Sequence, residues 1–288
     1  MNQRSRLDVF FWSSLILLIS QALAFCVASR EMAFLEANPQ IIPPQVSFEL
    51  PLAYFFGAVI VLGVVLFLIP ISKLRLALRI LFVALYSWGI FIVLALSLPF
   101  VLVVLISVAA GLVWFFSPRV WLHNLVMILT LVSVGSVFGL LLSPWTTLIL
   151  LLAISIYDIL AVRFGYMMWM AKKLSESDVL PAFIIPKTLS GWNLSLRGGG
   201  FKKVIEGESA EREFSILGGG DVGFPLVLIV SVFATYGFTR SLVVAAFSVV
   251  GLIGAYWIQR FFLKGKPMPA IPPISFACLI GFLIVRFI

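Results

Sequence analysis

Nine long apolar stretches, separated by short polar connections, run through the chain. A bilayer core of about 30 Å needs roughly 20 apolar residues of helix, because every backbone polar group in lipid must be satisfied within the segment. Stretches of this kind occupy residues 9–28, 50–69, 76–97, 99–116, 120–142, 145–162, 217–236, 241–262 and 270–288. The pattern predicts an all-α membrane protein with about nine transmembrane helices.

The third and fourth stretches form one apolar run over residues 76–116. At 1.5 Å per residue, a single helix of that length would be about twice as long as the bilayer core is thick. Proline does not continue a regular helix, so we expect a tight reversal at Pro99.

Composition agrees with this class, since 62% of the residues are apolar and only 11% are charged, against roughly 45–50% and 25% in soluble domains. Cys26 and Cys278 each lie inside an apolar stretch, so we expect neither a disulfide framework nor a thiolate metal site. A net charge of +8 would suggest a nucleic-acid partner for a soluble protein, but here the basic residues lie in the connections between apolar stretches. That distribution encodes membrane topology. The expected partner is therefore the lipid bilayer, with no nucleic acid.

The Lys and Arg residues also indicate the orientation. If the N-terminus is cytoplasmic, seventeen of the 20 basic residues lie inside, and only Arg30, Arg240 and Arg286 lie outside. Eight of the seventeen belong to one long loop and carry little topological weight, yet nine against three remain. We expect a cytoplasmic N-terminus and, with nine helices, a C-terminus on the outside.

The first apolar stretch has a second interpretation. Arg4 and Arg6 precede it, and the Ala-Leu-Ala sequence at residues 22–24 resembles a signal-peptidase site. The apolar stretch continues past that site through residues 25–27, which favours a retained helix.

One long polar connection divides the chain into three parts. Residues 1–162 form an expected six-helix part, residues 163–216 a cytoplasmic or interfacial loop, and residues 217–288 a three-helix part. Within the loop, residues 164–174 mix aromatic, Met and Lys residues, which is typical of a helix lying in the membrane interface.

The rest of the loop combines short apolar segments with polar ones. Residues 183–185 and 214–217 are apolar enough to pair as two strands. Gly198-Gly199-Gly200 and the charged run over residues 206–213 have the composition of a mobile loop.

Two acidic residues lie inside apolar stretches, Asp158 and Asp221, whereas the other ten lie in connections, at stretch edges or before the first stretch. A carboxylate buried in the bilayer costs several kcal/mol, so such residues usually face a cavity, pair with a partner and serve a function. The nearest basic residue, Arg163, is five positions from Asp158 and therefore off its helix face.

The predicted topology places the two aspartates at similar depth, because Asp158 lies near the cytoplasmic end of the sixth helix and Asp221 near the cytoplasmic start of the seventh. If these helices pack together, the two carboxyl groups share one proton, since neighbouring carboxylates do not both ionise cheaply. In that state one carboxylate takes a proton from water while the other, protonated, polarises a scissile carbonyl.

The surroundings of both aspartates favour an irregular backbone. Three glycines at residues 218–220 directly precede Asp221 and allow water and an extended chain to approach closely. Four prolines lie at the head of the last stretch, where we expect them to prevent regular helix and to leave carbonyls free to line a cavity or pair with a substrate strand. They are Pro267, Pro269, Pro272 and Pro273.

Three short motifs lie in register on the sixth, seventh and ninth predicted helices. They are Tyr157-Asp158, Gly218-Gly219-Gly220-Asp221 and Pro269-Ala270-Ile271. Together they resemble the signature of the presenilin and signal peptide peptidase family of intramembrane aspartyl proteases, which has Tyr-Asp, Gly-x-Gly-Asp and Pro-Ala-Leu at these places. Order, helix number and the long intervening loop agree along the whole chain. Ile271 in place of Leu is the one departure, a mild change of shape.

The resemblance implies an activity and a set of site residues. Asp158 and Asp221 would be catalytic, and the substrate would be a transmembrane helix of another membrane protein. Residues expected to support the active site or bind substrate are Tyr157, Leu217, Gly218, Gly219, Gly220, Pro269, Ala270 and Ile271. The orientation matches the presenilin branch, and the resemblance is to a prokaryotic, archaeal homologue, which would lie in the cell membrane as a multi-pass protein. No cofactor is expected, and association into a homo-oligomer is left open.

Other functions also fit parts of this sequence pattern. A carboxylate-based secondary transporter or cation channel also has broken helices near acidic residues, but it should show inverted repeats, and none is evident. A noncatalytic scaffold would leave two embedded acids unexplained. Among proteases, His123 is the only histidine and the sequence has no His-Glu-x-x-His, so no metal site is expected. Prepilin peptidases share Gly-x-Gly-Asp but lack the proline motif of the ninth helix.

Overall fold

The computed structural model of the chain describes residues 3–41, 46, 49–205, 213–262 and 268–287. Most of the charged run predicted as a mobile loop, and Pro267, lie outside these residues.

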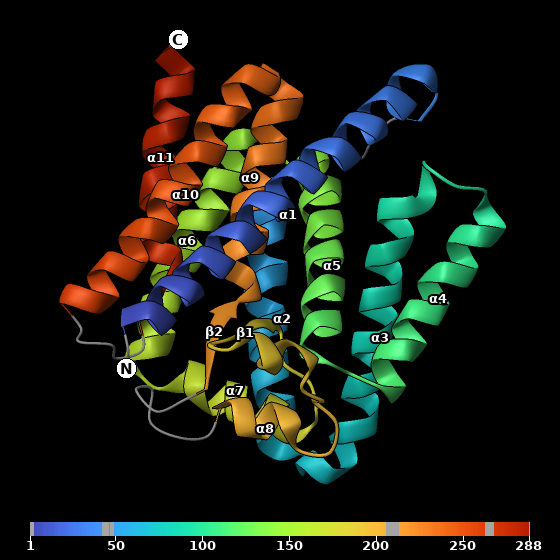
Figure 1. Ribbon diagram of the computed structural model, residues 1–288. Helices are drawn as coiled ribbons and strands as arrows, with labels where there is room; N and C mark the ends of the chain where they lie inside the picture. The colour runs from blue at the N-terminus through green and yellow to red at the C-terminus, as the bar shows by residue number, and fades with distance from the viewer. Residues whose placement is uncertain (1–2, 42–45, 47–48, 206–212, 263–267, 288) are drawn as a thin grey trace. The chain divides into compact units, whose positions relative to one another are not determined.

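Within the described part of the chain, nine apolar helices correspond one by one to the nine predicted stretches (Figure 1). They are α1 (Gln3–Ala37), α2 (Glu49–Leu68), α3 (Ile71–Ala95), α4 (Phe100–Phe116), α5 (Val120–Leu141), α6 (Pro144–Arg163), α9 (Gly219–Tyr236), α10 (Phe238–Phe261) and α11 (Ile271–Phe287). Within the described residues, seven of these helices are long and apolar enough to cross a membrane. Helices α4 and α11 are shorter apolar helices of 17 residues. The prediction of a multi-pass, all-α membrane protein is confirmed, and the sides of the termini stay a prediction.

Two helices extend beyond the predicted apolar stretches. Helix α1 continues to Ala37 and so includes Glu31, and α3 begins at Ile71 and includes Arg75 and Arg79. Glu and Arg are good helix formers, so a helix does not end where its lipid-like composition ends. The expected reversal at Pro99 is confirmed, because this proline directly precedes the first residue of α4.

The connection between α6 and α9 contains five short elements. They are α7 (Tyr166–Glu176), β1 (Ala182–Pro186), the 3-10 helix η1 (Leu189–Asn193), α8 (Gly200–Ile205) and β2 (Phe214–Gly218). The predicted interfacial segment is indeed a helix, α7, and the two predicted strands pair antiparallel, with Phe183 opposite Leu217. Helix α8 was not predicted, because it begins at the last of three consecutive glycines, which favour a loop. Gly198 and Gly199 form the turn before it, at φ 65° and 93°.

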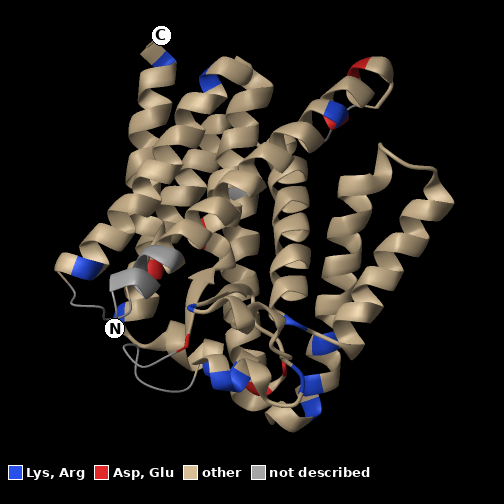
Figure 2. Ribbon diagram, in the orientation of Figure 1, with Lys and Arg blue, Asp and Glu red and all other residues tan. Residues whose placement is uncertain are grey.

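The chain forms two compact units that cut across several helices. Unit 1 comprises residues 1–13, 56–130 and 161–219, and unit 2 comprises residues 14–55, 131–160 and 220–288. Unit 1 thus holds α3, α4, the two strands and the short helices, whereas unit 2 holds α9, α10, α11 and most of α6. Figure 2 shows the Lys and Arg residues of unit 1 gathered around the start of α3, α7 and α8.

The core of unit 1 is an aromatic cluster around His123, which is fully buried. Trp114 Nε1 donates to His123 Nδ1 over 3.3 Å, which places the proton of the neutral ring on Nε2, and Nε2 then donates to the Ala182 carbonyl over 2.9 Å. Tyr86 and Phe201 pack edge-on against the same ring.

Strand β1 is hydrogen-bonded on both of its edges. Strand β2 pairs with one edge. On the other, the Asn124 side chain donates to the Ile184 carbonyl over 2.7 Å and accepts from the Ile184 N–H over 3.0 Å. The Asn124 amide therefore takes the place of a third strand at this residue.

Small residues let the helices of unit 2 approach closely. Gly135 and Gly139 form a Gly-x-x-x-Gly face on α5, where an added Cβ would lie 2.8 Å from Leu226 Cβ and 2.5 Å from Val230 Cβ of α9. Such faces are typical of helix pairs in lipid, where packing replaces the hydrophobic effect as the driving force. Gln21 of α1 donates to Ser248 Oγ of α10 over 2.7 Å, a polar contact between two helices.

Helix α11 lies against α10 and α6 (Figure 1). Ser275 Oγ is 3.4 Å from the Leu151 carbonyl, and the Trp145 and Phe282 rings meet edge-on with centroids 5.0 Å apart. On the α10 side, a Cβ at Gly251 would lie 2.5 Å from Ile274 Cα. Gly251 therefore sets the spacing of α10 and α11.

We expect Gly251→Ala to destabilise the protein by about 1–3 kcal/mol, because the new methyl group overlaps backbone of α11 that has no space to move. Gly254→Ala on the same helix is the matched control, since nothing lies within 4 Å of its added Cβ, and alanine is the better helix former. The measurement is the midpoint of thermal unfolding in detergent. Equal midpoints for the two variants would contradict the close approach at Gly251.

Candidate active site

Asp158 lies in the body of α6 and is only 1% exposed. Neither carboxyl oxygen accepts a hydrogen bond from a described residue. The backbone N–H of Ile271 lies close enough to favour a negative charge on this carboxyl group, but it does not form a hydrogen bond of good geometry with it. A buried carboxyl group without partners costs free energy that a purely structural residue would not need. Asp158 is therefore a candidate for a role in chemistry.

Asp221 lies in the first turn of α9 and is half-buried. Strand β2 ends at Gly218 and α9 begins at the next residue, so the aspartate follows a strand-to-helix junction. Pro225 lies one turn further on and has no N–H to donate to the Asp221 carbonyl. The helix that carries Asp221 thus begins with glycines and lacks one regular hydrogen bond in its first turns.

Ile271 connects the surroundings of the two aspartates. Its backbone N–H faces Asp158, and its Cδ1 lies 3.5 Å from where a Cβ of Gly220 would be. Gly220 directly precedes Asp221, so both motifs meet the first residue of α11. The third predicted motif is therefore part of the same site in unit 2.

The proline segment before α11 differs partly from its prediction. Pro269 and Ala270 are half-buried and precede the helix as irregular backbone, as expected. Pro272 and Pro273 were expected to prevent helix, but they lie in its first turn. Proline is tolerated there because the first N–H groups of a helix have no intrahelical acceptor.

Phe55 is a second connection between the motifs, and no pattern in the sequence points to it. Its ring meets Tyr157 edge-on at 6.1 Å between centroids and Phe224 edge-on at 5.5 Å. Phe224 in turn lies 3.1 Å from where a Cβ of Gly220 would be. Phe224 could have been inferred, since it is three positions after Asp221 on one helix face. Phe55 lies about a hundred residues away along the chain.

Three of the predicted supporting residues belong to unit 1. Leu217 and Gly218 are the last residues of β2, and the Gly219 N–H donates to the Pro181 carbonyl over 3.0 Å. A Cβ at Gly219 would lie 3.0 Å from that carbonyl oxygen and equally close to Met127 Cε. These residues fix the strand that leads into α9.

The family model described as signal-peptide peptidase, presenilin aspartyl protease matches residues 14–288. The chain belongs to this family. It is an intramembrane aspartyl protease, which confirms the activity that the three motifs implied and sets aside the transporter, channel and scaffold interpretations. No curated protein matches the chain.

Solved structures agree on the fold of the protease. Two structures of a presenilin family intramembrane aspartate protease, in space groups C222 and P2, match with TM-scores of 0.64 and 0.63, each at 20% sequence identity. The matches cover 96% and 95% of this chain and 98% and 96% of those chains.

We expect Phe55→Ala to lower proteolytic activity on the order of tenfold, because two edge-on aromatic contacts of roughly 0.5–1.5 kcal/mol each hold Tyr157 and the start of α9. The measurement is the rate of cleavage of a transmembrane substrate by purified protease. Phe67→Ala is the control on the same helix, since that ring is 79% exposed. Activities that fall equally in both variants would show that Phe55 has no special role.

Proposed function

We propose that Asp158 and Asp221 are the catalytic pair of this protease. The observation that carries the proposal is the buried Asp158 carboxyl group, which has no hydrogen-bond partner among the described residues. The contacts of Ile271 and Phe55 with both motifs support it. Both aspartates come from one chain, so the chemistry needs no second copy, and a homo-oligomer stays a prediction.

The two aspartates occupy different environments, and this suggests their roles. Asp221 lies at the N-terminal end of α9, where the helix dipole favours negative charge. Asp158 lies inside α6, away from any helix start. Asp221 is then the carboxylate that takes a proton from water, and Asp158 is the acid that donates its proton to the carbonyl oxygen of the scissile bond.

The reaction proceeds in two steps. Hydroxide from the deprotonated water bonds to the carbonyl carbon and forms a tetrahedral diol. The proton held by Asp221 then passes to the amide nitrogen, the C–N bond breaks, and a hydroxyl proton returns to Asp158. The products are a carboxylic acid and an amine, and the pair is restored to its starting state.

The protease acts on transmembrane substrates within the bilayer. Since a helix in lipid hydrogen-bonds its own carbonyls, the scissile segment must first leave the helical conformation. Gly220 lets Phe224 and Ile271 pack close to the start of α9 beside Asp221, and we infer that Tyr157, Pro269 and Ala270 contact the unwound segment. Leu217, Gly218 and Gly219 act by positioning the start of α9.

We also propose that the N-terminus and the loop over residues 163–216 are cytoplasmic, because the basic residues are concentrated on that side. The loop then separates the six-helix part, which ends at residue 162, from the three-helix part, which begins at residue 217.

In a variant whose own cysteines are replaced by serine, a membrane-impermeant maleimide added to intact cells should label Thr239→Cys and not Ser190→Cys. Both positions are exposed. Labelling of only Ser190→Cys would reverse the orientation. The cell membrane as location rests on a prokaryotic source, which stays a prediction.

Asp158→Asn and Asp221→Asn should each lower cleavage of a transmembrane substrate by at least about 10²–10⁴-fold, because an amide neither takes up nor donates the required proton. Both variants keep the shape of the side chain, so the midpoint of thermal unfolding should change little. Full activity in either variant would remove that aspartate from the mechanism.

Infrared difference spectroscopy on the same variants tests the roles. The carbonyl stretch of a protonated carboxylic acid should disappear in Asp158→Asn and persist in Asp221→Asn. The opposite pattern would exchange the acid and the base while leaving the pair itself intact.

A further inference from the structure

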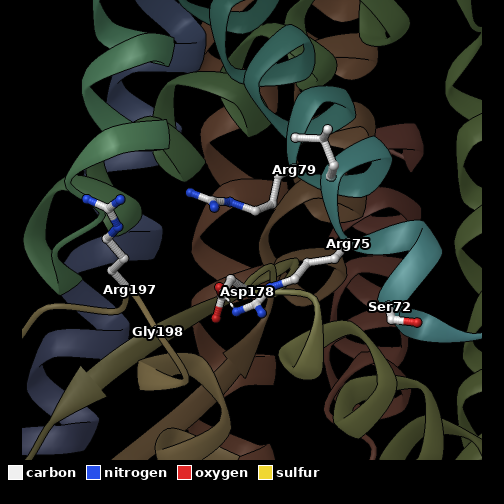
Figure 3. Close-up of a pocket in the computed structure, with 7 residues that line it drawn as sticks. Ser72, Arg75, Arg79, Asp178, Arg197 and Gly198 are labelled. Carbon is white, nitrogen blue, oxygen red and sulfur yellow. Dashed lines mark hydrogen bonds and ion pairs between the residues drawn. The ribbon is translucent and has the colours of Figure 1, made fainter.

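An open hollow of about 380 Å³ lies in unit 1, outside the region of the two aspartates. Figure 3 shows three arginine side chains from two segments directed toward it around one carboxylate. Its lining comes from the start of α3 and from the connection between α6 and α9, and it includes Ser72, Arg75, Leu76, Arg79, Asp178 and Arg197.

The one carboxylate among the lining residues already has a partner at each of its two oxygens. Asp178 is 4% exposed, and its Oδ2 is ion-paired with Arg75. Its Oδ1 accepts a hydrogen bond of 3.1 Å from the Gly199 N–H. Asp178 therefore neutralises one guanidinium and ties the turn before α8 to α3.

The other two guanidinium groups have no anionic partner among the described residues. Arg79 donates to the Phe115 carbonyl, and Arg197 donates to the Phe116 carbonyl over 3.1 Å. These are neutral acceptors at the last residues of α4. In addition, Nε of Arg79 is buried without a hydrogen-bond partner.

A structural explanation accounts for only part of this arrangement. Bonding the last carbonyls of α4 needs one donor from each arginine, whereas a guanidinium has five. Asp178 attracts Arg79 electrostatically, whereas Arg75 and Arg197 both repel it, as like charges at close range do. An anion in the hollow would relieve that repulsion and use the remaining donors.

The chemistry of the walls points to a phosphate group. Arginine binds phosphate oxygens in a fork of two parallel N–H bonds, and two unneutralised guanidinium groups match its negative charge. Apolar residues lie beside the hollow on the same helices, since Leu76 and Ile80 of α3 are 60% and 54% exposed and Phe116 of α4 is 59% exposed. These are surfaces for acyl chains in a helix pair that faces lipid.

We propose that this hollow binds the phosphate of an anionic phospholipid, with the headgroup between Arg79 and Arg197 and the acyl chains along α3 and α4. Basic pockets beside transmembrane helices recognise lipid headgroups in this way. Free phosphate shares the headgroup chemistry, so the experiment must separate the two sources.

The test titrates the purified full-length protease in neutral detergent with phosphatidylglycerol, phosphatidylcholine or inorganic phosphate and counts bound ligand by native mass spectrometry. Phosphatidylglycerol should bind at least about tenfold more tightly than phosphatidylcholine, whose choline compensates the phosphate. Ser72→Glu adds a carboxylate to the exposed rim without removing a contact, and it should weaken phosphatidylglycerol binding about fivefold to tenfold.

Leu189→Glu is the matched control, since it adds the same charge at a residue that is 80% exposed and does not line the hollow. The double variant Arg79→Gln, Arg197→Gln should lose more affinity than Ser72→Glu, but it also removes contacts with α4, so Ser72→Glu decides the outcome. Equal phosphatidylglycerol affinity in Ser72→Glu and Leu189→Glu overturns the proposal. Binding of inorganic phosphate that Ser72→Glu weakens, without a preference for phosphatidylglycerol, overturns the lipid as its source.

Discussion

A buried backbone polar group must be hydrogen-bonded, whether lipid or protein surrounds it, and this constraint applies wherever the chain departs from a regular helix. The two-stranded sheet of unit 1 shows how the constraint is met. Strand β1 is bonded to β2 on one edge, and on the other the Asn124 amide serves both backbone groups of Ile184. His123 serves the Ala182 carbonyl in the same way. Asparagine and histidine at the start of α5 therefore allow a sheet edge to be buried.

Close backbone approach provides the other source of cohesion. In lipid, burying apolar side chains gains little, because the tails are as apolar as leucine, and helices associate through packing instead. Gly135 and Gly139 on α5 face α9, and Gly251 on α10 faces α11. These contacts place the two helices that carry the second and third motifs. Glycine spacing thus connects helix packing with the position of the proposed catalytic pair.

Much of this arrangement could be predicted from the sequence, because lipid imposes long apolar stretches and makes embedded charges conspicuous. The nine helices, the reversal at Pro99 and the pairing of β1 with β2 followed from local patterns. Phe55 and the burial of His123 did not, because both depend on contacts between segments far apart in the chain. The arginine hollow was hidden for another reason: Arg75 lies outside the predicted third stretch, which begins at residue 76, whereas it belongs with Arg79 to the first turns of α3.

The environments of the two aspartates follow from the elements that carry them. Asp158 lies within the body of α6, where its carboxyl group is buried and only the Ile271 N–H lies close to it. Asp221 lies at a helix start, where the first N–H groups have no intrahelical acceptor and the dipole is positive. The Gly219 N–H is bonded to Pro181, so the strand that precedes α9 fixes where this helix begins. Two like side chains are thus placed in unlike surroundings, and that difference supports the proposed roles of one as the acid and the other as the base.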